Sequence, residues 1–323
     1  MAPARRNRSA GSTRPLRLMS GVLADSLDLP PTIQLEPMGG PCGITLRGVD
    51  LSDDLPGEVI GALVAVANHA GLVHLPDQRR LDPRRQAEIS EWFGRIFLRD
   101  GEVDRIATVS ETPVQILGSE ALDAAGAVPG ADMDRGQPLP THSDVQDYAV
   151  TPDFTILHCV ETPPPAAGGR THWSDLFRAY DELDEVTRKA VTGRRWVPPS
   201  TAATAYGVGM QAAKRAAGND GPSLASAVRH PVVRTHPVTR RRALWVSSFT
   251  TRIEGIGSED EERAMAERLR NHVNQDRFWT THEWTAQDVM IWDNRCVNHR
   301  RDGWDPSYRR TMHRSQAGAA RPF

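Results

Sequence analysis

Cysteine is scarce in this chain. Only three occur among its 323 residues, Cys42, Cys159 and Cys296. They lie far apart, without a C-x-x-C pair and without the even number that a disulfide framework requires. This scarcity excludes a disulfide-stabilised scaffold and a thiolate zinc site, and it fits a protein that works in a reducing cytoplasm.

Long apolar runs and a dominant charge sign are also absent. No stretch approaches the roughly 20 apolar residues of a membrane-spanning helix, and the N-terminus lacks the apolar core of a signal peptide. Lysine and arginine total 39 against 41 aspartate and glutamate, a formal net charge of -2. Such a balance gives no field that would draw the chain to nucleic acid or to a membrane. We therefore expect a cytoplasmic protein whose partner is a small molecule, with a homo-oligomer left open.

The chain does contain enough apolar sequence for one large domain. Hydrophobic residues make up 39% of it, and no repeat or long linker divides it, so we expect a single domain over residues 31–323. Residues 1–30 begin with an arginine-rich stretch and are expected to form a flexible basic tail, with a transit peptide as the alternative. Residues 201–224 follow neither a helical nor a strand period. We interpret them as a lid loop, with a disordered insertion as the alternative.

Four helices are indicated by the residues at their ends. Asp82 is the expected N-cap ahead of Pro83, and Ser258 with Glu261 has the spacing of a capping box. Glycine supplies two of the stops, because it readily adopts the left-handed conformation that ends helices. The predicted helices are a segment around 59–67 that stops at Gly71, one that starts after Asp82, one from 174 or 175 to Gly193, and one that starts at Ser258.

Short segments rich in Val, Ile, Thr, Trp and Phe lie between the helices. Pro and Gly punctuate them, and strands do not alternate regularly with helices, which argues against a doubly wound sheet. We expect a mainly β protein with flanking helices, built on a double-stranded β-helix (jelly roll, cupin-like) core. The predicted strands are 44–49, 154–160, 232–235, 243–249, 289–292 and 311–313.

Two histidines and one aspartate are candidate metal ligands. Alternate side chains of a strand share a face, so His142 and Asp144 of the sequence T-H-S-D would point to the same side. His299, far downstream, would supply a second imidazole. Two histidines and one carboxylate on one face of iron(II) leave three open positions, as in non-haem iron oxygenases. Taken one at a time, a chance H-x-D triplet and a surface histidine remain the simpler interpretations.

Two arginines near the C-terminus are candidate anion ligands. Arg310 and Arg314 stand four residues apart in RRTMHRSQ, so on a strand both would enter the same cavity. The planar fork of a guanidinium suits bidentate binding of a carboxylate. Solvated arginines are the alternative. His313 alternates with Arg314 and should face away from the metal.

Other prominent side chains are expected to be structural. Trp173, Trp245 and Trp292 lie in apolar strand contexts and are predicted to be core residues. His230 and His236 flank a predicted strand without a matching carboxylate nearby in the sequence. We interpret these two histidines as satisfied turn or surface residues.

Three long segments carry a resemblance to a known family. They are THSDVQDYAVTPDFTILHCVETPPPAAGGRTHWSDLFRAYDEL, then HPVVRTHPVTRRRALWV with FTTRI after it, and DVMIWDNRCVNHRRDGWDPSYRRTMHR. From about residue 35 to residue 323 the chain resembles the TauD/TfdA (taurine dioxygenase) family of Fe(II)- and 2-oxoglutarate-dependent dioxygenases. The resemblance implies a jelly-roll fold and iron(II) held by His142, Asp144 and His299, with 2-oxoglutarate and O2 as co-substrates.

The resemblance also implies where the co-substrate and the substrate bind. Thr171, in the Gly-Gly-Arg-Thr turn, and Arg310 match positions that hold the distal carboxylate of 2-oxoglutarate in the family. Arg314 matches a second arginine, which faces the active site and often meets an anionic group of the substrate. Related halogenases lack the carboxylate ligand, so Asp144 implies hydroxylation, desaturation, epoxidation or ring closure rather than halogenation.

The substrate is where the chain departs from its taurine-specific relatives. Those relatives use a histidine and an asparagine where this chain has Arg99 and residues near Pro138, which puts taurine itself in doubt. With Arg314 and Arg99 as cations, we expect a small anionic substrate that bears a carboxylate. An acidic terpenoid or another specialised metabolite, as in antibiotic biosynthesis, is one hypothesis for this substrate. The alternatives are a taurine, alkylsulfonate or aryloxyalkanoate dioxygenase and, in other classes, a non-catalytic jelly-roll binding protein or a zinc hydrolase.

Overall fold

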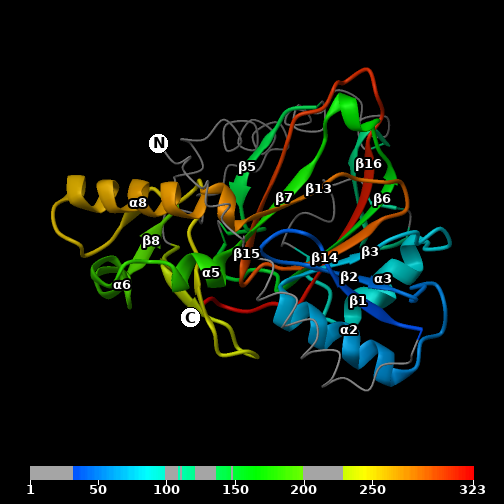
Figure 1. Cartoon of the computed structure of the whole chain (residues 1–323), viewed down its shortest axis with the longest axis horizontal. Helices are drawn as coiled ribbons and strands as arrows, with labels where there is room; N and C mark the ends of the chain where they lie inside the picture. Colours follow the sequence, from blue (N-terminus) through cyan, green and yellow to red (C-terminus); the bar gives the residue numbers. More distant parts are fainter. Residues whose placement is uncertain (1–31, 99–107, 110, 121–135, 147, 199–227) are drawn as a thin grey trace, which may run out of the picture.

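Two β-sheets form the centre of the molecule (Figure 1). The computed structural model describes residues 32–98, 108, 109, 111–120, 136–146, 148–198 and 228–323. The larger sheet has seven strands, and every neighbouring pair in it is antiparallel except β2 with β3. In spatial order its strands are β1 (Gln34–Pro37), β2 (Ile44–Arg47), β3 (Leu72–Leu75), β14 (Val289–Asp293), β6 (Phe154–Glu161), β16 (Thr311–Ala317) and β4 (Gln115–Gly118).

The smaller sheet has four strands, all antiparallel to their neighbours. In spatial order they are β13 (Trp279–His282), β7 (Thr171–Asp175), β15 (Val297–Arg301) and β5 (Leu139–His142). Strands far apart in the sequence lie side by side in both sheets, because the chain crosses repeatedly from one sheet to the other. This confirms the predicted mainly β architecture with a jelly-roll core.

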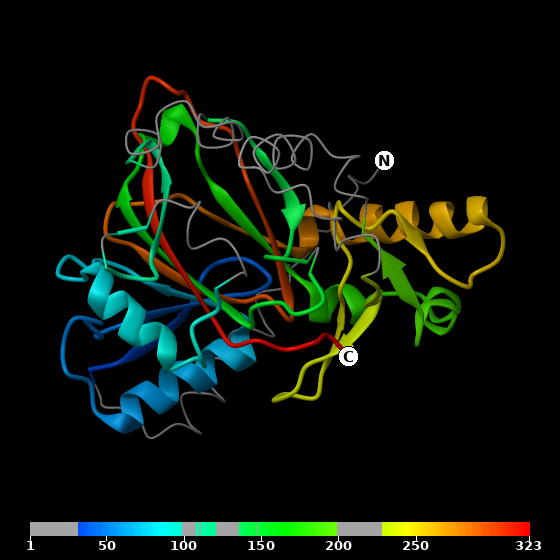
Figure 2. The same cartoon turned by 180° about the vertical axis from the view of Figure 1, so that it is seen from behind.

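Two helices cover the larger sheet near its N-terminal strands (Figures 1 and 2). Helix α2 (Gly57–Ala70) buries Leu63 and Val66 in a core that also contains Val73 of β3. It ends at Gly71, whose φ of 71° is left-handed, as predicted. Helix α3 (Pro83–Glu91) begins as predicted after Asp82, whose side chain accepts hydrogen bonds from two backbone N–H groups of the first turn.

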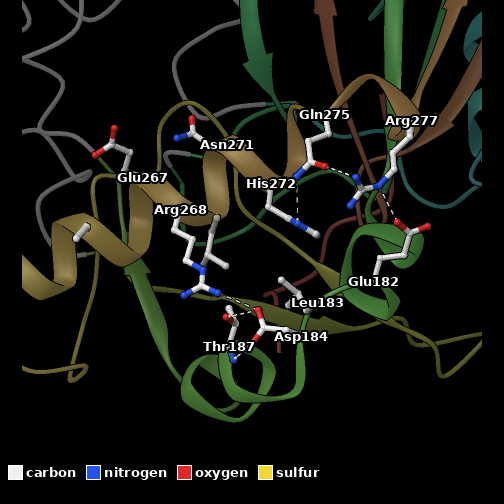
Figure 3. A pocket seen from close by; sticks show the side chains of 12 residues that line it. Glu182, Leu183, Asp184, Thr187, Glu267, Arg268, Asn271, His272, Gln275 and Arg277 are labelled. Carbon is white, nitrogen blue, oxygen red and sulfur yellow. Dashed lines mark hydrogen bonds and ion pairs between the residues drawn. The ribbon is translucent and has the colours of Figure 1, made fainter.

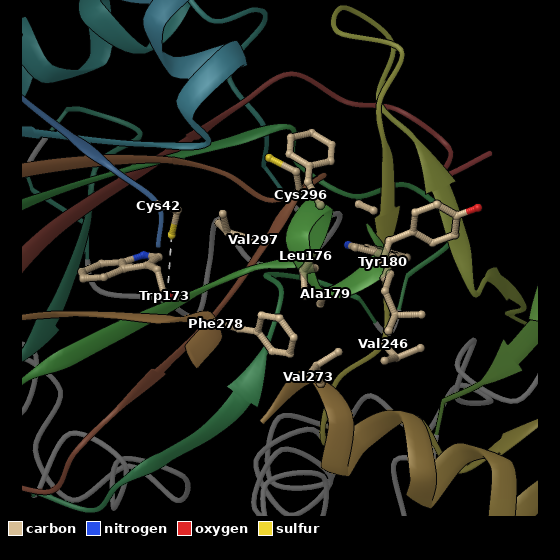
Figure 4. Packing of buried hydrophobic residues seen from close by; sticks show 14 of the residues in the cluster. Cys42, Trp173, Leu176, Ala179, Tyr180, Val246, Val273, Phe278, Cys296 and Val297 are labelled. Carbon is tan, nitrogen blue, oxygen red and sulfur yellow. Dashed lines mark hydrogen bonds between the residues drawn. The ribbon is translucent and has the colours of Figure 1, made fainter. Parts of the chain in front are cut away.

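A second core, rich in tryptophan, lies between the two main sheets and continues against the helices beside the smaller sheet. Figure 4 shows part of this packing, in which Trp173 lies on the β7 side and Phe278 nearer the helices. Trp173, Trp245 and Trp292 are 0%, 2% and 2% exposed, which confirms the prediction that they are core residues. The other helical segments in the described part of the chain are α5 (Leu176–Asp181), α6 (Glu185–Val191), α8 (Glu259–Val273), η2 (Pro165–Ala167) and η4 (Asp276–Phe278).

One predicted helix is wrong in its extent. The segment expected to run from 174 or 175 to Gly193 forms two helices, α5 and α6, because Asp184 interrupts it and caps the second helix through Thr187 N–H. Val186, a hydrophobic residue of α6, is 78% exposed as a result. Helix α8 does begin with the predicted capping box, in which Ser258 and Glu261 each accept a hydrogen bond from the other's backbone.

Two small sheets extend the structure beside the smaller main sheet. They comprise β10 (Val233–Thr235) with β11 (Arg242–Leu244), and β12 (Arg252–Ile253) with β8 (Arg195–Val197) and β9 (His230–Pro231). The strand predicted over 243–249 is therefore mostly irregular chain after β11. The strand predicted over 311–313 continues instead to Ala317, because β16 pairs with both β6 and β4.

Two predicted segments, the basic tail over residues 1–30 and the lid loop over 201–224, lie outside the described residues. Among the helices that the structure describes, none combines the length and the apolar character that crossing a bilayer requires.

Candidate active site

Three predicted ligands converge between the two sheets. His142 is the last residue of β5 and pairs in register with His299 of the neighbouring strand β15. Asp144 Oδ1 lies 3.8 Å from His142 Nε2 and 3.7 Å from His299 Nε2. The three ligand atoms lie within 4.8 Å of one another. The structure thus brings together side chains that are far apart in sequence.

The chain leaves β5 before it reaches Asp144, yet the alternation of side chains persists. Ser143 points to the opposite side, where its hydroxyl donates to Val297 O at 3.2 Å and lies 2.9 Å from Asn298 Oδ1. Val145 then turns the backbone sharply with a positive φ of 57°. The predicted strand is too long here, but the common orientation of His142 and Asp144 is present.

The imidazoles are held in the form that binds a metal. His142 Nδ1 lies 2.7 Å from Pro140 O, and because a carbonyl can only accept, Nδ1 carries the proton and Nε2 presents a lone pair. Burial lowers the pKa of His142. Burial, together with the neighbouring charge of His142, lowers the pKa of His299 to about 3. Both rings are therefore neutral near pH 7.

The two oxygens of the Asp144 carboxylate have different neighbours. Thr155 of β6 donates its hydroxyl proton to Oδ2 at 2.6 Å, while Oδ1 faces both imidazoles at distances too long for hydrogen bonds. Burial alone would raise the pKa of Asp144, but in the acid range where this group titrates protonated His299, together with the positive charge of Arg314, outweighs burial and lowers the pKa well below its usual range. Asp144 is therefore ionised, with free lone pairs on Oδ1.

The donor set fits divalent iron. Two neutral imidazole nitrogens and one carboxylate oxygen, all directed to one point, form the facial arrangement of non-haem iron(II) oxygenases. Each ligand is also held from behind by a hydrogen bond or by packing, as metal ligands usually are. Pro140 O holds His142, Thr155 holds Asp144, and the Trp292 ring lies 4.8 Å from the His299 ring.

Arg314 extends from β16 toward the same point. Its Nη1 lies 3.8 Å from Asp144 Oδ1, and its side chain is 16% exposed. Gln115 of β4, its partner in register, accepts hydrogen bonds from Nε at 2.8 Å and from Nη2 at 2.5 Å. The neighbouring His313 points elsewhere, with Nε2 3.5 Å from Glu120 Oε2, in agreement with the predicted alternation.

Thr171 and Arg310 lie on neighbouring parts of the structure. Thr171 begins β7, directly after the Gly-Gly-Arg turn, and is 3% exposed. Arg310 immediately precedes β16 and is 4% exposed, with its guanidinium 5.3 Å from the centre of the Trp304 ring. A Cβ built on Gly169 would lie 3.7 Å from Cδ of Arg310, so this arginine packs against the turn that leads to Thr171.

Three supporting residues were not predicted from the sequence. Thr155 holds Asp144, Gln115 holds Arg314, and Trp284 donates its indole N–H to Thr171 Oγ1 at 2.9 Å. Each contact joins segments that sequence spacing alone does not connect. The strand alternation around Phe154 could at most have placed Thr155 inside the barrel. Arg99, the other predicted substrate ligand, lies outside the described residues.

Two histidines expected at turns or at the surface are buried instead. His230 and His236 are 1% and 0% exposed. His236 Nε2 lies 2.9 Å from Oδ2 of Asp293, a carboxylate 57 residues away in the sequence, and His230 Nε2 donates to Gln146 O at 2.8 Å. They are satisfied, as predicted, but inside the protein, because tertiary contacts supply partners that local sequence does not show.

A polar hollow on the surface lies between α8 and the α5–α6 connection (Figure 3). Both of its arginines pair with acidic side chains: Arg268 contacts Asp184 at 2.9 Å and Arg277 contacts Glu182 at 2.7 Å. None of the three converging ligands lines it. We therefore assign these charges to the packing of the helices.

Comparison with known proteins agrees with the geometry. The chain matches the family described as "Taurine catabolism dioxygenase TauD, TfdA family" over residues 28–316. It is 30% identical over 296 residues to the (S)-phenoxypropionate/alpha-ketoglutarate-dioxygenase of Delftia acidovorans, covering 90% of this chain and 96% of that protein. It is 29% identical over 271 residues to the alpha-ketoglutarate-dependent sulfate ester dioxygenase of Pseudomonas putida, covering 83% of each. Alpha-ketoglutarate is 2-oxoglutarate.

Solved structures share the fold. A taurine dioxygenase from Burkholderia xenovorans superposes with a TM-score of 0.70 at 27% identity, covering 90% of this chain and 93% of that chain. AAD-2, crystallised in complex with Mn(II) and N-oxalylglycine, superposes with a TM-score of 0.74 at 23% identity, covering 90% and 99%. The chain therefore belongs to the TauD/TfdA family and is an Fe(II)- and 2-oxoglutarate-dependent dioxygenase.

Proposed function

We propose that this dioxygenase oxidises a C–H bond of a small, carboxylate-bearing substrate of the aryloxyalkanoate type, held beside the metal by Arg314. The position of Arg314 carries the proposal. Its guanidinium lies on the inner face of the barrel, and Asp144 is its one ion-pair partner among the described residues. Asp144 is also a predicted metal ligand, so its negative charge would be shared with the metal. The positive charge of Arg314 then calls for a second anion.

The environment of Arg314 supports recognition of an anion. Gln115 accepts two of its hydrogen bonds, and an amide oxygen orients a guanidinium without neutralising it. A carboxylate in front of the arginine could form charge-assisted hydrogen bonds, which are shorter and stronger than neutral ones. Arg314 would therefore orient the substrate as well as bind it, so that one C–H bond faces the metal.

The names of similar proteins favour an aryloxyalkanoate within the class of organic anions. One relative is named for (S)-phenoxypropionate and two others for 2,4-dichlorophenoxyacetate, all aryloxyalkanoic acids. Another is named for sulfate esters, which are also anionic. Fungal relatives named cnsM and oryG are alpha-ketoglutarate-dependent dioxygenases whose names give no substrate. An aryloxyalkanoate is therefore the first candidate, with a sulfate ester second.

The remaining roles follow from the donor side chains of the site. His142, Asp144 and His299 would hold iron(II), and Thr171 with Arg310 would hold the distal carboxylate of 2-oxoglutarate. When bound, iron and 2-oxoglutarate supply the activation of O2 and the oxidative decarboxylation that yields succinate and carbon dioxide. Trp284 donates its proton to Thr171 Oγ1, which leaves the threonine proton free to be donated to a carboxylate.

Release of succinate in the presence of iron(II), O2 and 2-oxoglutarate tests the proposal. The panel contains phenoxypropionate enantiomers, dichlorophenoxyacetate, an alkyl sulfate ester, taurine, an acidic terpenoid and the neutral amide of the best acid. We expect the acid to stimulate release and its amide to fail. Arg314→Gln should raise KM for the acid strongly. Arg47→Gln, which changes an exposed arginine paired with Glu36, is the matched control. Equal turnover of acid and amide would refute recognition of the anion.

A further inference from the structure

A second group of two histidines and one aspartate lies apart from the three proposed iron ligands. His74 and His282 direct their Nε2 atoms at opposite oxygens of Asp288, at 3.2 Å from Oδ1 and 3.0 Å from Oδ2. Their ring centres are 4.6 Å apart and their planes are tilted by 54°. We propose that His74, His282 and Asp288 form a second binding site for a zinc-type divalent transition metal ion.

The group bridges the two main sheets. His74 lies in β3 of the larger sheet, and Asp288 immediately precedes β14 of the same sheet. His282 is the last residue of β13 in the smaller sheet and pairs in register with Thr171. A metal ion held by all three would therefore connect the sheets on the side of the barrel where β3 and β13 approach each other.

The distances fit a metal ion. Ligands bound at about 2.0–2.1 Å in tetrahedral geometry lie about 3.3 Å from one another. The contacts at 3.2 Å and 3.0 Å, each to a different oxygen of Asp288, are close to this value, and one ligand atom from each of the three residues lies within 4.8 Å of the others. Two imidazole nitrogens and one carboxylate oxygen are the protein ligands of many three-ligand zinc sites, where water takes the fourth position.

The surrounding groups suit a cation. Hydrogen bonds hold the ligands from behind: Thr45 Oγ1 lies 3.3 Å from His74 Nδ1, and Thr285 N–H donates to Asp288 Oδ2 at 2.9 Å. When His74 Nε2 binds a metal, its ring proton must sit on Nδ1, where Thr45 can accept it. Within the described part of the chain, no arginine or lysine forms an ion pair with Asp288.

A third group, His236, Asp293 and Cys296, differs from the proposed site because its carboxylate is paired with an arginine. It also places three ligand atoms together, but Arg295 donates to both oxygens of Asp293, at 2.8 Å and 2.5 Å. A guanidinium already supplies the positive charge there and occupies the lone pairs that a metal ion would need. His74 Nε2 is buried and has no hydrogen-bond partner of good geometry among the described residues, so its lone pair is available to a metal ion, and the side chains of His74 and His282 are 13% and 11% exposed.

The test measures metal binding with the iron ligands removed. In the full chain carrying His142→Ala and Asp144→Ala, Zn2+ is titrated against a chromophoric chelator, and Co2+ is followed by its visible d–d bands. We expect roughly one equivalent of Zn2+ to bind and to raise the melting temperature, because a metal that binds only the folded state stabilises it. Binding of no Zn2+ by this variant would overturn the proposal.

Two further substitutions in that background separate a metal ligand from a structural hydrogen bond. Asp288→Asn should weaken Zn2+ binding by roughly tenfold or more, as loss of a ligand does. His74→Gln keeps a side-chain hydrogen-bond donor but removes the imidazole, so it should fold and still lose the metal. If Asp288→Asn does not fold, metal binding by His74→Gln is the test of the site. Asp302→Asn is the control, since Asp302 contacts a single imidazole, His172, at 3.0 Å. Equal Zn2+ affinity in His74→Gln and its parent would overturn the assignment.

Discussion

Replacing Thr155 with valine tests how Asp144 is prepared for iron. Valine has nearly the shape of threonine but cannot donate a hydrogen bond. Thr155 is fully buried and donates to Asp144 Oδ2 at 2.6 Å, which fixes the carboxylate plane so that Oδ1 faces the two imidazoles. We expect Thr155→Val to fold and to bind iron(II) more weakly, because the carboxylate loses the group that orients it.

The size of the effect follows from the charge of the acceptor. A hydrogen bond to a charged group contributes about 1.5–3 kcal/mol, and about 1.4 kcal/mol corresponds to a tenfold change in affinity. The expected loss of iron(II) affinity is therefore about 10- to 100-fold, the range usually seen when a group behind a metal ligand is removed. Thr155 Oγ1 also accepts from Asn294 Nδ2 at 2.9 Å, so the stability of the protein should fall as well.

The measurement is an anaerobic titration of iron(II) in the presence of 2-oxoglutarate, followed by the weak visible charge-transfer band of the chelate. Thr187→Val is the matched control. Thr187 is equally buried and donates to Asp184 Oδ2 at 2.7 Å, but it lies on α6 and contacts none of the proposed iron ligands. We expect it to lower stability without changing iron affinity. An unchanged affinity in Thr155→Val would mean that this hydrogen bond does not prepare the carboxylate.

Three further predictions concern other parts of the structure. Asp144→Ala should abolish succinate release and the charge-transfer band while the protein stays folded; retained activity would contradict its role as a ligand. Trp284→Phe should raise KM for 2-oxoglutarate several-fold, by about 1 kcal/mol of lost binding, and change kcat little, because it removes the donor that orients the Thr171 hydroxyl; an unchanged KM would contradict that role. Burial lowers the pKa of His230 to about 4, below its unfolded value of about 6.5. As pH falls, the unfolded state therefore takes up the proton first, so the protein is fully stable in this respect above pH 6.5 and loses up to about 3 kcal/mol toward pH 4. Urea unfolding at pH 7 and pH 5 should give a smaller difference in the free energy of unfolding for His230→Gln than for the wild-type chain. An equal difference would contradict the assignment.

Local signals were enough to predict the helix ends that carry a cap or a glycine stop. The caps at Asp82 and Ser258 and the stop at Gly71 depend on residues within one turn of the helix end, so the sequence determines them directly. The break at Asp184 was missed because apolar spacing continues through it. The aspartate ends one helix and caps the next through its own side chain.

The strands that carry the site were harder to predict. Strands β5 and β15 hold His142 and His299 and contain polar residues such as Asn298 and Arg300, so they lack the β-branched pattern that signals a strand. Their pairing comes from sheet register rather than from local propensity. The three candidate ligands could be named because family motifs mark them, although those motifs give no information about the groups behind these residues.

The two His-His-Asp groups differ in how their ligands are held apart. At the proposed iron site, Pro140 and Thr155 occupy the outer atoms of His142 and Asp144, and the inner atoms stay 3.7–3.8 Å apart with no hydrogen bond between them. At the second group His282 Nε2 forms a hydrogen bond with Asp288 Oδ2 at 3.0 Å, and His74 Nε2 lies 3.2 Å from Oδ1. The lone pairs of the first group are already free to bind a metal. In the second group a metal ion has to replace the hydrogen bond between His282 and Asp288. For equal ligands, iron(II) should therefore bind the first group faster, because no hydrogen bond between its ligands has to break.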